Sequence, residues 1–345
     1  MKKILLLGLV TLGLSVLSAC TLGTGSDEDR SITLYSDRHY ESDQDLFDQF
    51  EEETGIKVNV VKASADELIT RLEQEGSDTE ADLLLIADAG RLHRAKEKEL
   101  LGEVNSTLLE ERIPAIYQDS DDMWFGLTKR ARVLVYHPDR VSEEDLSTYE
   151  ALGEDEWMNR VVIRSSTNIY NQSMIASMLA LHGEEYVRDF VSSLVDNFAR
   201  TPEGNDRDQA KAVMAGIGDV AILNTYYMGK MAFSSDPYEV EVAETLRVFF
   251  PNQETSGTHV NVSAIGLTAH SDNRDDAILL MEFLASEEAQ SSFANANYEY
   301  PVNENVDPHP LLASWGDFRA QDLSLTQLGI YANEAAILMD EEGWE

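Results

Sequence analysis

Three polar stretches of this sequence carry a histidine or tyrosines where an apolar run gives way to a helical pattern. The first stretch, LYSDRHYESDQDLF, holds His39 and Tyr40 side by side. The second, VVIRSSTNIYNQSM, holds Tyr170, and the third, DVAILNTYYMGK, holds the pair Tyr226 and Tyr227. Each stretch is typical of a strand-to-helix junction, and in a doubly wound sheet such junctions gather along one edge. We therefore expect these five side chains to face one point.

Several phenols and one imidazole suit one kind of metal ion better than the other metal ions that proteins bind. A free phenol has a pKa near ~10, so tyrosine is a poor ligand for most divalent metals at neutral pH. A small, hard, trivalent cation displaces the phenolic proton, and imidazole also suits iron. The absence of cysteine ligands disfavours zinc and copper(I). The residue types therefore predict a site for Fe(III).

Each of these residues also has an ordinary interpretation. A lone histidine in a loop is usually a solvated side chain. Two adjacent tyrosines inside a strand point to opposite faces of the sheet, so they serve one ion only where the backbone turns. Tyr35, Tyr136 and Tyr298 are expected to be packing residues. The spacing of these residues leaves both interpretations open.

The elements that must position these side chains follow an α/β order. Buried apolar runs alternate with amphipathic stretches, which predicts parallel strands covered by helices, and the pattern restarts near residue 132. Ser64 and Glu67 form a capping box at the start of one helix. The expected strands are 32–36, 56–62, 82–87, 132–137, 161–164, 219–224, 246–250 and 260–268. The expected helices are 43–53, 64–75, 90–100, 173–181, 184–198, 275–284 and 327–340.

The N-terminus, MKKILLLGLVTLGLSVLSAC, has the pattern of an export signal. Residues 1–19 form the predicted signal peptide, and Leu-Ser-Ala-Cys resembles the lipobox of bacterial lipoproteins, so Cys20 is the predicted lipidation site. Cys20 is the single cysteine in the chain, which the lipid explains. Residues 20–30 are small and acidic and are expected to form a flexible tether. The body of the protein is then extracytoplasmic and held at a membrane by its lipid alone.

Two similar α/β sets in an exported, tethered chain predict a two-lobed solute-binding protein, with ligand in the cleft between the lobes. About 310–320 residues follow the tether, which also favours two domains. We assign residues 31–127 and 264–305 to lobe 1, and residues 128–263 and 306–345 to lobe 2. Residues 127–136 and 261–268 are the predicted hinge strands, because one α/β set gives way to the other there.

The formal net charge is −38, from 64 acidic and 26 basic residues. Such a charge repels phosphates, which excludes nucleic acids as partners. Because acidic residues occur in nearly every predicted helix, we interpret them as a solvated surface and not as a dedicated metal store. The sequence has no Gly-rich phosphate loop, Ser-His-Asp set or Cys-His pair at usable spacing, so we expect no catalysis.

Five stretches together resemble the ferric-iron-binding proteins of bacterial ABC importers, known as bacterial transferrins. They are YSDRHYESDQDLFDQFEEETGIKV, TKRARVLVYHPDRV, RSSTNIYNQSMIASML, ILNTYYMGKM and NEAAILMDEEGW. The resemblance runs in order over nearly the whole chain after the tether. It implies a type II periplasmic-binding-protein fold, a monomer, and a permease partner in the cytoplasmic membrane. It also implies a set of iron ligands, namely His39, Tyr40, Tyr170, Tyr226 and Tyr227.

Some members of that family complete the metal shell with a bound anion such as phosphate or carbonate. Arg130 and Arg132, in the predicted hinge strand, are candidates to hold such an anion or to balance phenolate charge. Surface salt bridges are the alternative role for both. Two rival functions also stand: a protein of the same fold that binds a polyamine or a sugar by stacking on its tyrosines, and a secreted enzyme.

Overall fold

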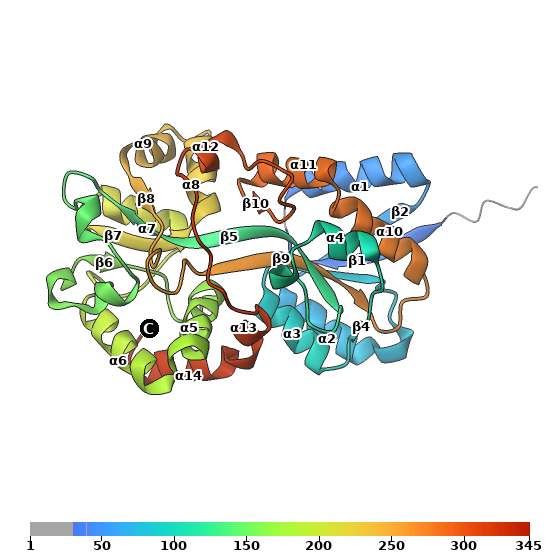
Figure 1. Ribbon diagram of the computed structural model, residues 1–345, viewed down its shortest axis with the longest axis horizontal. Helices are drawn as coiled ribbons and strands as arrows, with labels where there is room; N and C mark the ends of the chain where they lie inside the picture. Colours follow the sequence, from blue (N-terminus) through green and yellow to red (C-terminus); the bar gives the residue numbers. More distant parts are fainter. Residues whose placement is uncertain (1–29, 39) are drawn as a thin grey trace, which may run out of the picture.

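The computed structural model describes residues 30–38 and 40–345. The predicted signal peptide, Cys20, His39 and all of the tether except its last residue therefore lie outside the described residues. The described chain forms two α/β halves that lie end to end (Figure 1). Two long strands, β5 (Trp124–Tyr136) and β9 (Val260–Thr268), pass between the halves.

The remaining strands and the helices follow the alternation that the sequence predicts. The strands are β1 (Ser31–Ser36), β2 (Lys57–Lys62), β3 (Leu83–Ile86), β4 (Leu101–Gly102), β6 (Val161–Val162), β7 (Val220–Asn224), β8 (Arg247–Phe249) and β10 (Tyr300–Pro301). The helices are α1 (Glu41–Thr54), α2 (Ala65–Glu75), α3 (Ala89–Glu97), α4 (Thr107–Arg112), α5 (Ile169–His182), α6 (Glu184–Asp196), α7 (Asp206–Met214), α8 (Thr225–Ala232), α9 (Pro237–Thr245), α10 (Arg274–Leu284), α11 (Glu287–Asn297), α12 (Pro310–Ala313), α13 (Thr326–Ile330) and α14 (Ala332–Glu341).

The sheet runs in the order β2-β1-β3-β9-β5-β7-β6. Parallel pairing is confirmed for β1 with β2 and β3, and for β6 with β7. The expectation of parallel strands is wrong for β5 and β9, which pair antiparallel with each other and with β7 and β3. Parallel neighbours need a crossover connection, whereas β5 and β9 carry the chain directly from one half to the other in opposite directions.

The buried apolar side chains form two groups, of which the first extends through both halves and the second lies within one half. Strand β3, whose four residues are Leu-Leu-Leu-Ile, is fully buried in the first group. Helix α1 packs Leu46, Phe47 and Phe50 into the same group and ends at Gly55, whose φ of 71° is the left-handed conformation that glycine adopts readily. Each such side chain contributes about 1.5–3 kcal/mol when fully buried. Trp157 and Trp344 lie in the second group.

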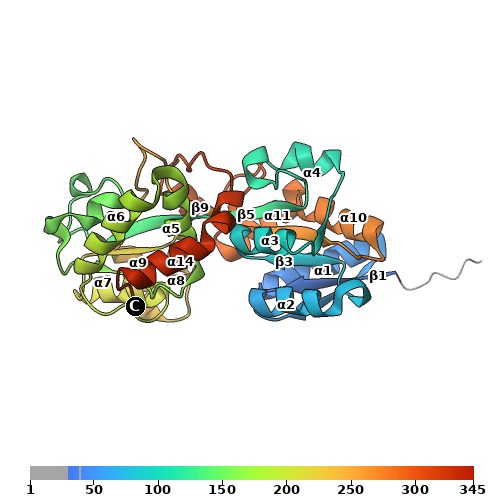
Figure 2. The same cartoon turned by 90° about the horizontal axis from the view of Figure 1, so that it is seen from below.

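The prediction of one C-terminal helix over 327–340 is wrong. The segment forms two helices, α13 and α14, which meet at Tyr331. Helix α13 contacts α3 of one half and α5 of the other, while α14 packs along α5 (Figure 2). The break therefore lets the chain turn at the junction of the two halves.

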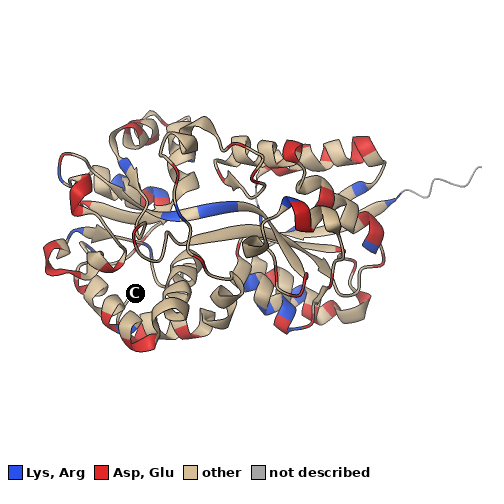
Figure 3. Cartoon of the chain, viewed as in Figure 1, with Lys and Arg blue, Asp and Glu red and all other residues tan. Residues whose placement is uncertain are grey.

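Charged side chains are distributed unevenly over the molecule. Acidic residues are spread over the outer helices, whereas β5 carries basic residues through the middle of the molecule (Figure 3). Within residues 30–38 and 40–345, no three His, Cys, Asp or Glu side chains gather in a metal-binding arrangement. None of the helices in these ranges has the length and apolar character needed to cross a membrane.

Candidate metal centre

Four of the five predicted ligand residues line one cavity of about 400 Å³. Tyr40 is the residue that caps α1, Tyr170 lies in the first turn of α5, and Tyr226 and Tyr227 lie in the first turn of α8. Strands β6 and β7, which precede α5 and α8, are parallel neighbours, so the two junctions lie side by side. His39 lies outside the described residues.

Direct contacts link three of these tyrosines. The Tyr226 hydroxyl donates a hydrogen bond to the Tyr170 hydroxyl at 3.2 Å. The ring centroids of Tyr226 and Tyr227 are 4.2 Å apart, so both rings of the adjacent pair turn to the same side. The start of α8 makes this possible because the backbone leaves the pleat of β7 there.

Three phenols of this cavity, those of Tyr40, Tyr226 and Tyr227, are hard to ionise without a bound cation. Burial raises the pKa of Tyr40 and of Tyr226 well above the usual value. The nearby Glu299 carboxylate raises the pKa of Tyr40 further, and the neighbouring phenols raise that of Tyr226. Burial likewise raises the pKa of Tyr227 to about 12. A ligand that takes phenolate oxygen must therefore supply enough positive charge to displace these protons. Each tyrosine sits at a helix N-terminus, where the helix dipole favours the negative charge that results.

The two arginines of β5 occupy different places. Arg130 is 2% exposed, and its guanidinium carbon lies 5.3 Å from the centroid of the Tyr170 ring. It donates to the carbonyl oxygen of Ala87, while its Nε and Nη1 have no partner among the described residues. Arg132 is 1% exposed and forms an ion pair with Asp206 at 2.7 Å. The alternative of surface salt bridges is wrong for both, because strand β5 runs through the interior.

A buried ion-pair network that the sequence analysis missed holds the loop in front of α1. The Arg38 Nε lies 2.8 Å from an Asp43 carboxylate oxygen, and its Nη1 lies 3.0 Å from Glu299 and 2.8 Å from the Ser263 hydroxyl. Its guanidinium carbon also lies 4.7 Å from the centroid of the Tyr40 ring. The network therefore ties Tyr40 to β9 and to the segment before β10. The sequence holds no local signal for Glu299, which comes to Arg38 from 261 residues away.

Lys230 is a second residue of the cavity that sequence analysis missed. Its ammonium nitrogen lies 3.7 Å from the centroid of the Tyr40 ring and 5.4 Å from that of Tyr226. Burial lowers its pKa to about 8. The sequence did carry a signal for Lys230. It follows Tyr226 by four positions, and residues four apart share one face of a helix.

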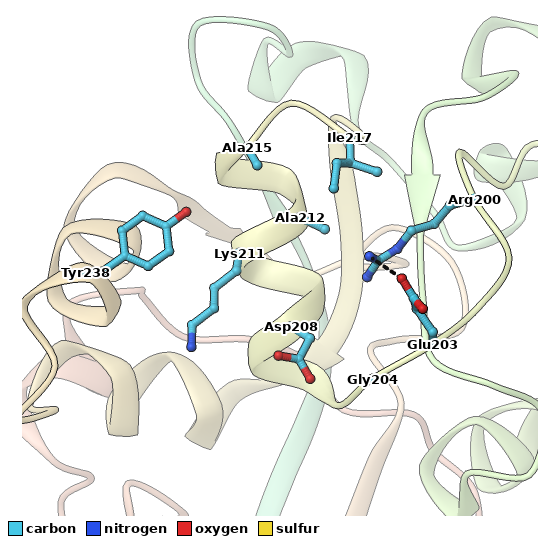
Figure 4. A pocket seen from close by; sticks show the side chains of 9 residues that line it. All are labelled: Arg200, Glu203, Gly204, Asp208, Lys211, Ala212, Ala215, Ile217 and Tyr238. Atoms are coloured by element: carbon cyan, nitrogen blue, oxygen red, sulfur yellow. Dashed lines mark hydrogen bonds and ion pairs between the residues drawn. The ribbon is translucent and has the colours of Figure 1, made fainter.

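A second cavity of the described chain lacks this chemistry. A groove of about 440 Å³ on the surface of α7 is lined by Arg200, Glu203, Lys211 and Tyr238, among others (Figure 4). Arg200 and Glu203 form an ion pair at 2.9 Å, and Lys211 is paired with a carboxylate. With one tyrosine, which is 42% exposed, this groove offers no set of converging phenols.

Comparison with known proteins agrees with the resemblance seen in the sequence. The chain is 45% identical to iron uptake protein A1 of Synechocystis over 342 residues, which cover 97% of this chain and 95% of that protein. A Trichodesmium protein solved in complex with iron and citrate ligands superimposes with a TM-score of 0.89 at 43% identity, covering 91% of this chain and all of that one. A ferric binding protein from Campylobacter jejuni superimposes with a TM-score of 0.86 at 39% identity, covering 91% and 100%.

These structural neighbours confirm the two-lobed α/β fold. The family model for bacterial extracellular solute-binding proteins matches residues 45–320, which is most of the described chain and includes both halves. The chain therefore belongs to the family of bacterial extracellular solute-binding proteins.

Proposed function

We propose that the protein captures Fe(III) between its two lobes, with the phenolate oxygens of Tyr40, Tyr170, Tyr226 and Tyr227 and the imidazole of His39 as ligands. One observation carries the proposal: four phenols from three helix N-termini line a single cavity. Relatives named for iron uptake and a neighbour solved with iron support the choice of metal.

The chemistry of capture follows from the phenols. An ion of charge +3 polarises each phenol enough to release its proton, whereas a divalent ion leaves a phenol of raised pKa neutral. Four phenolates and one Fe(III) make a complex of net charge −1. The buried guanidinium of Arg130 beside Tyr170 helps to hold that charge in the interior.

An anion in the metal shell is part of the proposal. The buried Nε and Nη1 of Arg130, which have no partner among the described residues, suit a carbonate or phosphate oxygen. Arg132 supports the site indirectly. The Asp206 carboxylate forms ion pairs with both Arg132 and Arg164, at nitrogen–oxygen distances of 2.7 and 2.6 Å.

The proposed setting is an ABC importer. The extracellular family supports an extracytoplasmic location. We further propose that a lipid on Cys20 and a tether over residues 20–30 hold the protein outside the cytoplasm. There it delivers iron to a permease in the cytoplasmic membrane. Residues 31–127 with 264–305 and residues 128–263 with 306–345 are the lobes that close on the ion. We expect a binding protein without catalytic activity, as its relatives are named.

Titration of the iron-free protein with ferric citrate tests the proposal. We expect saturation at one Fe(III) per chain with a visible absorption band, because Fe(III)-phenolate complexes show charge transfer. A polyamine or a sugar that stacks on the tyrosines would leave the protein colourless. Saturable binding of such a solute, without uptake of Fe(III), would replace iron by an organic ligand.

A further inference from the structure

Lys230 is placed unlike any other cation of the cavity. It lies one helical turn after Tyr226 on α8, in one half of the molecule, and its ammonium faces the ring of Tyr40 in the other half. Its side chain is half-buried and lines the cavity together with the tyrosines. The ammonium thus sits between two tyrosine rings from opposite sides of the cavity.

The other cations of the cavity wall are already neutralised. Arg38 pairs with Asp43 and Glu299, Arg91 with Asp66 at 2.9 Å, and Arg207 with Glu239 at 2.9 Å. Lys230 has no carboxylate within ion-pair distance among the described residues. Glu299, which exerts a Coulombic effect on it, already accepts hydrogen bonds from Arg38 and Thr128. Lys230 therefore brings an uncompensated positive charge to the phenols of Tyr40 and Tyr226, as the buried Arg130 does to Tyr170.

We propose that Lys230 is a selectivity residue, whose positive charge favours trivalent ions and rejects divalent ones. This inference rests on the proposed Fe(III) site. Fe(III) with four phenolates has a charge of −1 before any anion is added, and the neighbouring ammonium stabilises this negative charge. A divalent ion that leaves the phenols neutral keeps its charge of +2, which the same ammonium repels.

The position of the ammonium over the ring faces strengthens this discrimination. A cation within about 6 Å of an aromatic ring is attracted by the negative face of the ring. That attraction grows when the phenol becomes a phenolate, because the ring then carries part of the negative charge. Lys230 thus interacts more favourably with the ionised ligand set than with the neutral one.

The test compares the affinities of the full-length protein for Fe(III) and Zn(II) in wild type and in Lys230→Met. We expect the variant to lose about tenfold to a hundredfold in Fe(III) affinity, as removal of one unit charge a few ångströms from the complex implies. Its Zn(II) affinity should be unchanged or higher. Lys230→Arg keeps the charge and should keep the wild-type ratio of the two affinities, and Lys230→Gln repeats the neutral substitution with a polar side chain.

Lys129→Met is the matched control. Lys129 is also half-buried with its ammonium 5.0 Å from a tyrosine ring, that of Tyr117, but it does not line this cavity. It should leave the affinity ratio unchanged. If Lys230→Met and Lys230→Gln keep the wild-type ratio while the wild type binds Fe(III), the selectivity role is wrong and the iron site stands. A wild type that takes up no Fe(III) would overturn both proposals.

Discussion

The phenol of a buried tyrosine is a strong ligand only after it has lost its proton. Burial raises the pKa of Tyr40, Tyr226 and Tyr227, so these groups are neutral near pH 7 when no metal is bound. These three phenols then carry no negative charge that would attract Ca(II) or Mg(II). The raised pKa of these phenols therefore has two effects: Fe(III) can displace their protons and bind, whereas Ca(II) and Mg(II) meet neutral phenols.

Replacing Tyr226 or Tyr227 by phenylalanine should weaken Fe(III) binding by more than about tenfold. Loss of a residue that only supports a metal ligand already costs 10–100-fold, and here the ligand oxygen itself is removed while the ring stays. Absorption titration measures both the affinity and the expected bleaching of the visible band. His39→Ala should cost less, because a neutral donor contributes less to holding a trivalent ion.

Tyr35→Phe is the control for these substitutions. Its hydroxyl bonds to Glu75 and does not line the cavity, so iron binding should be unaffected. Full affinity and colour in both Tyr226→Phe and Tyr227→Phe would rule out this tyrosine pair as ligands.

Iron retention should fall steeply as the pH drops through the mildly acidic range. Each phenol with a raised pKa must release a proton when the metal binds, so each contributes up to about a tenfold loss of affinity per pH unit of acidification. Imidazole adds to this loss below its pKa near ~6.5. Tyr170→Phe should make the loss shallower, because one fewer proton competes with iron. The measurement is absorbance against pH without competing chelators, and equal slopes in the two proteins would remove Tyr170 from the ligand set.

At the element scale, most strands and helices were predictable because their periodicity is local. The 260–268 strand was predicted with the bounds of β9, and the capping box of Ser64 and Glu67 is present. The direction of β5 and β9 was not predictable, because strand polarity depends on how the chain passes between the halves. Glu299 was missed for a related reason, since its partner Arg38 is distant in sequence.

Arg38→Met should destabilise the fold by about 3–5 kcal/mol, because it leaves the carboxylates of Asp43 and Glu299 buried without their counter-charge. Urea denaturation measures the free energy of unfolding. Arg94→Met is the control, because Arg94 and its partner Asp66 are both exposed, and such pairs contribute about 0–1 kcal/mol. Equal stability losses in the two variants would show that the buried network does not hold the loop before α1.

At the scale of the whole molecule, the two halves meet at a second place besides β5 and β9. Asp88, at the start of α3, is fully buried and accepts hydrogen bonds from Ser173 of α5 at 2.7 Å and from Asn261 of β9 at 2.8 Å. Helix α13 contacts both α3 and α5 beside it. Movement of one lobe against the other would have to preserve or break these contacts.

Cys20→Ser should release the protein from membranes and leave iron binding unchanged, because the predicted lipid is carried on a tether outside the two lobes. Fractionation of cells that express the variant, followed by iron titration of the soluble form, measures both effects. Membrane attachment that persists in the variant would contradict the lipobox interpretation.

Resonance Raman spectroscopy of the iron-loaded protein shows whether phenolate oxygens hold the iron. Excitation within the visible band should enhance the ring vibrations of metal-bound tyrosinate, with loss of intensity in Tyr226→Phe and Tyr227→Phe. Stoichiometric Fe(III) binding without enhanced tyrosinate vibrations would rule out the tyrosines as iron ligands, because the iron would then be held by other groups.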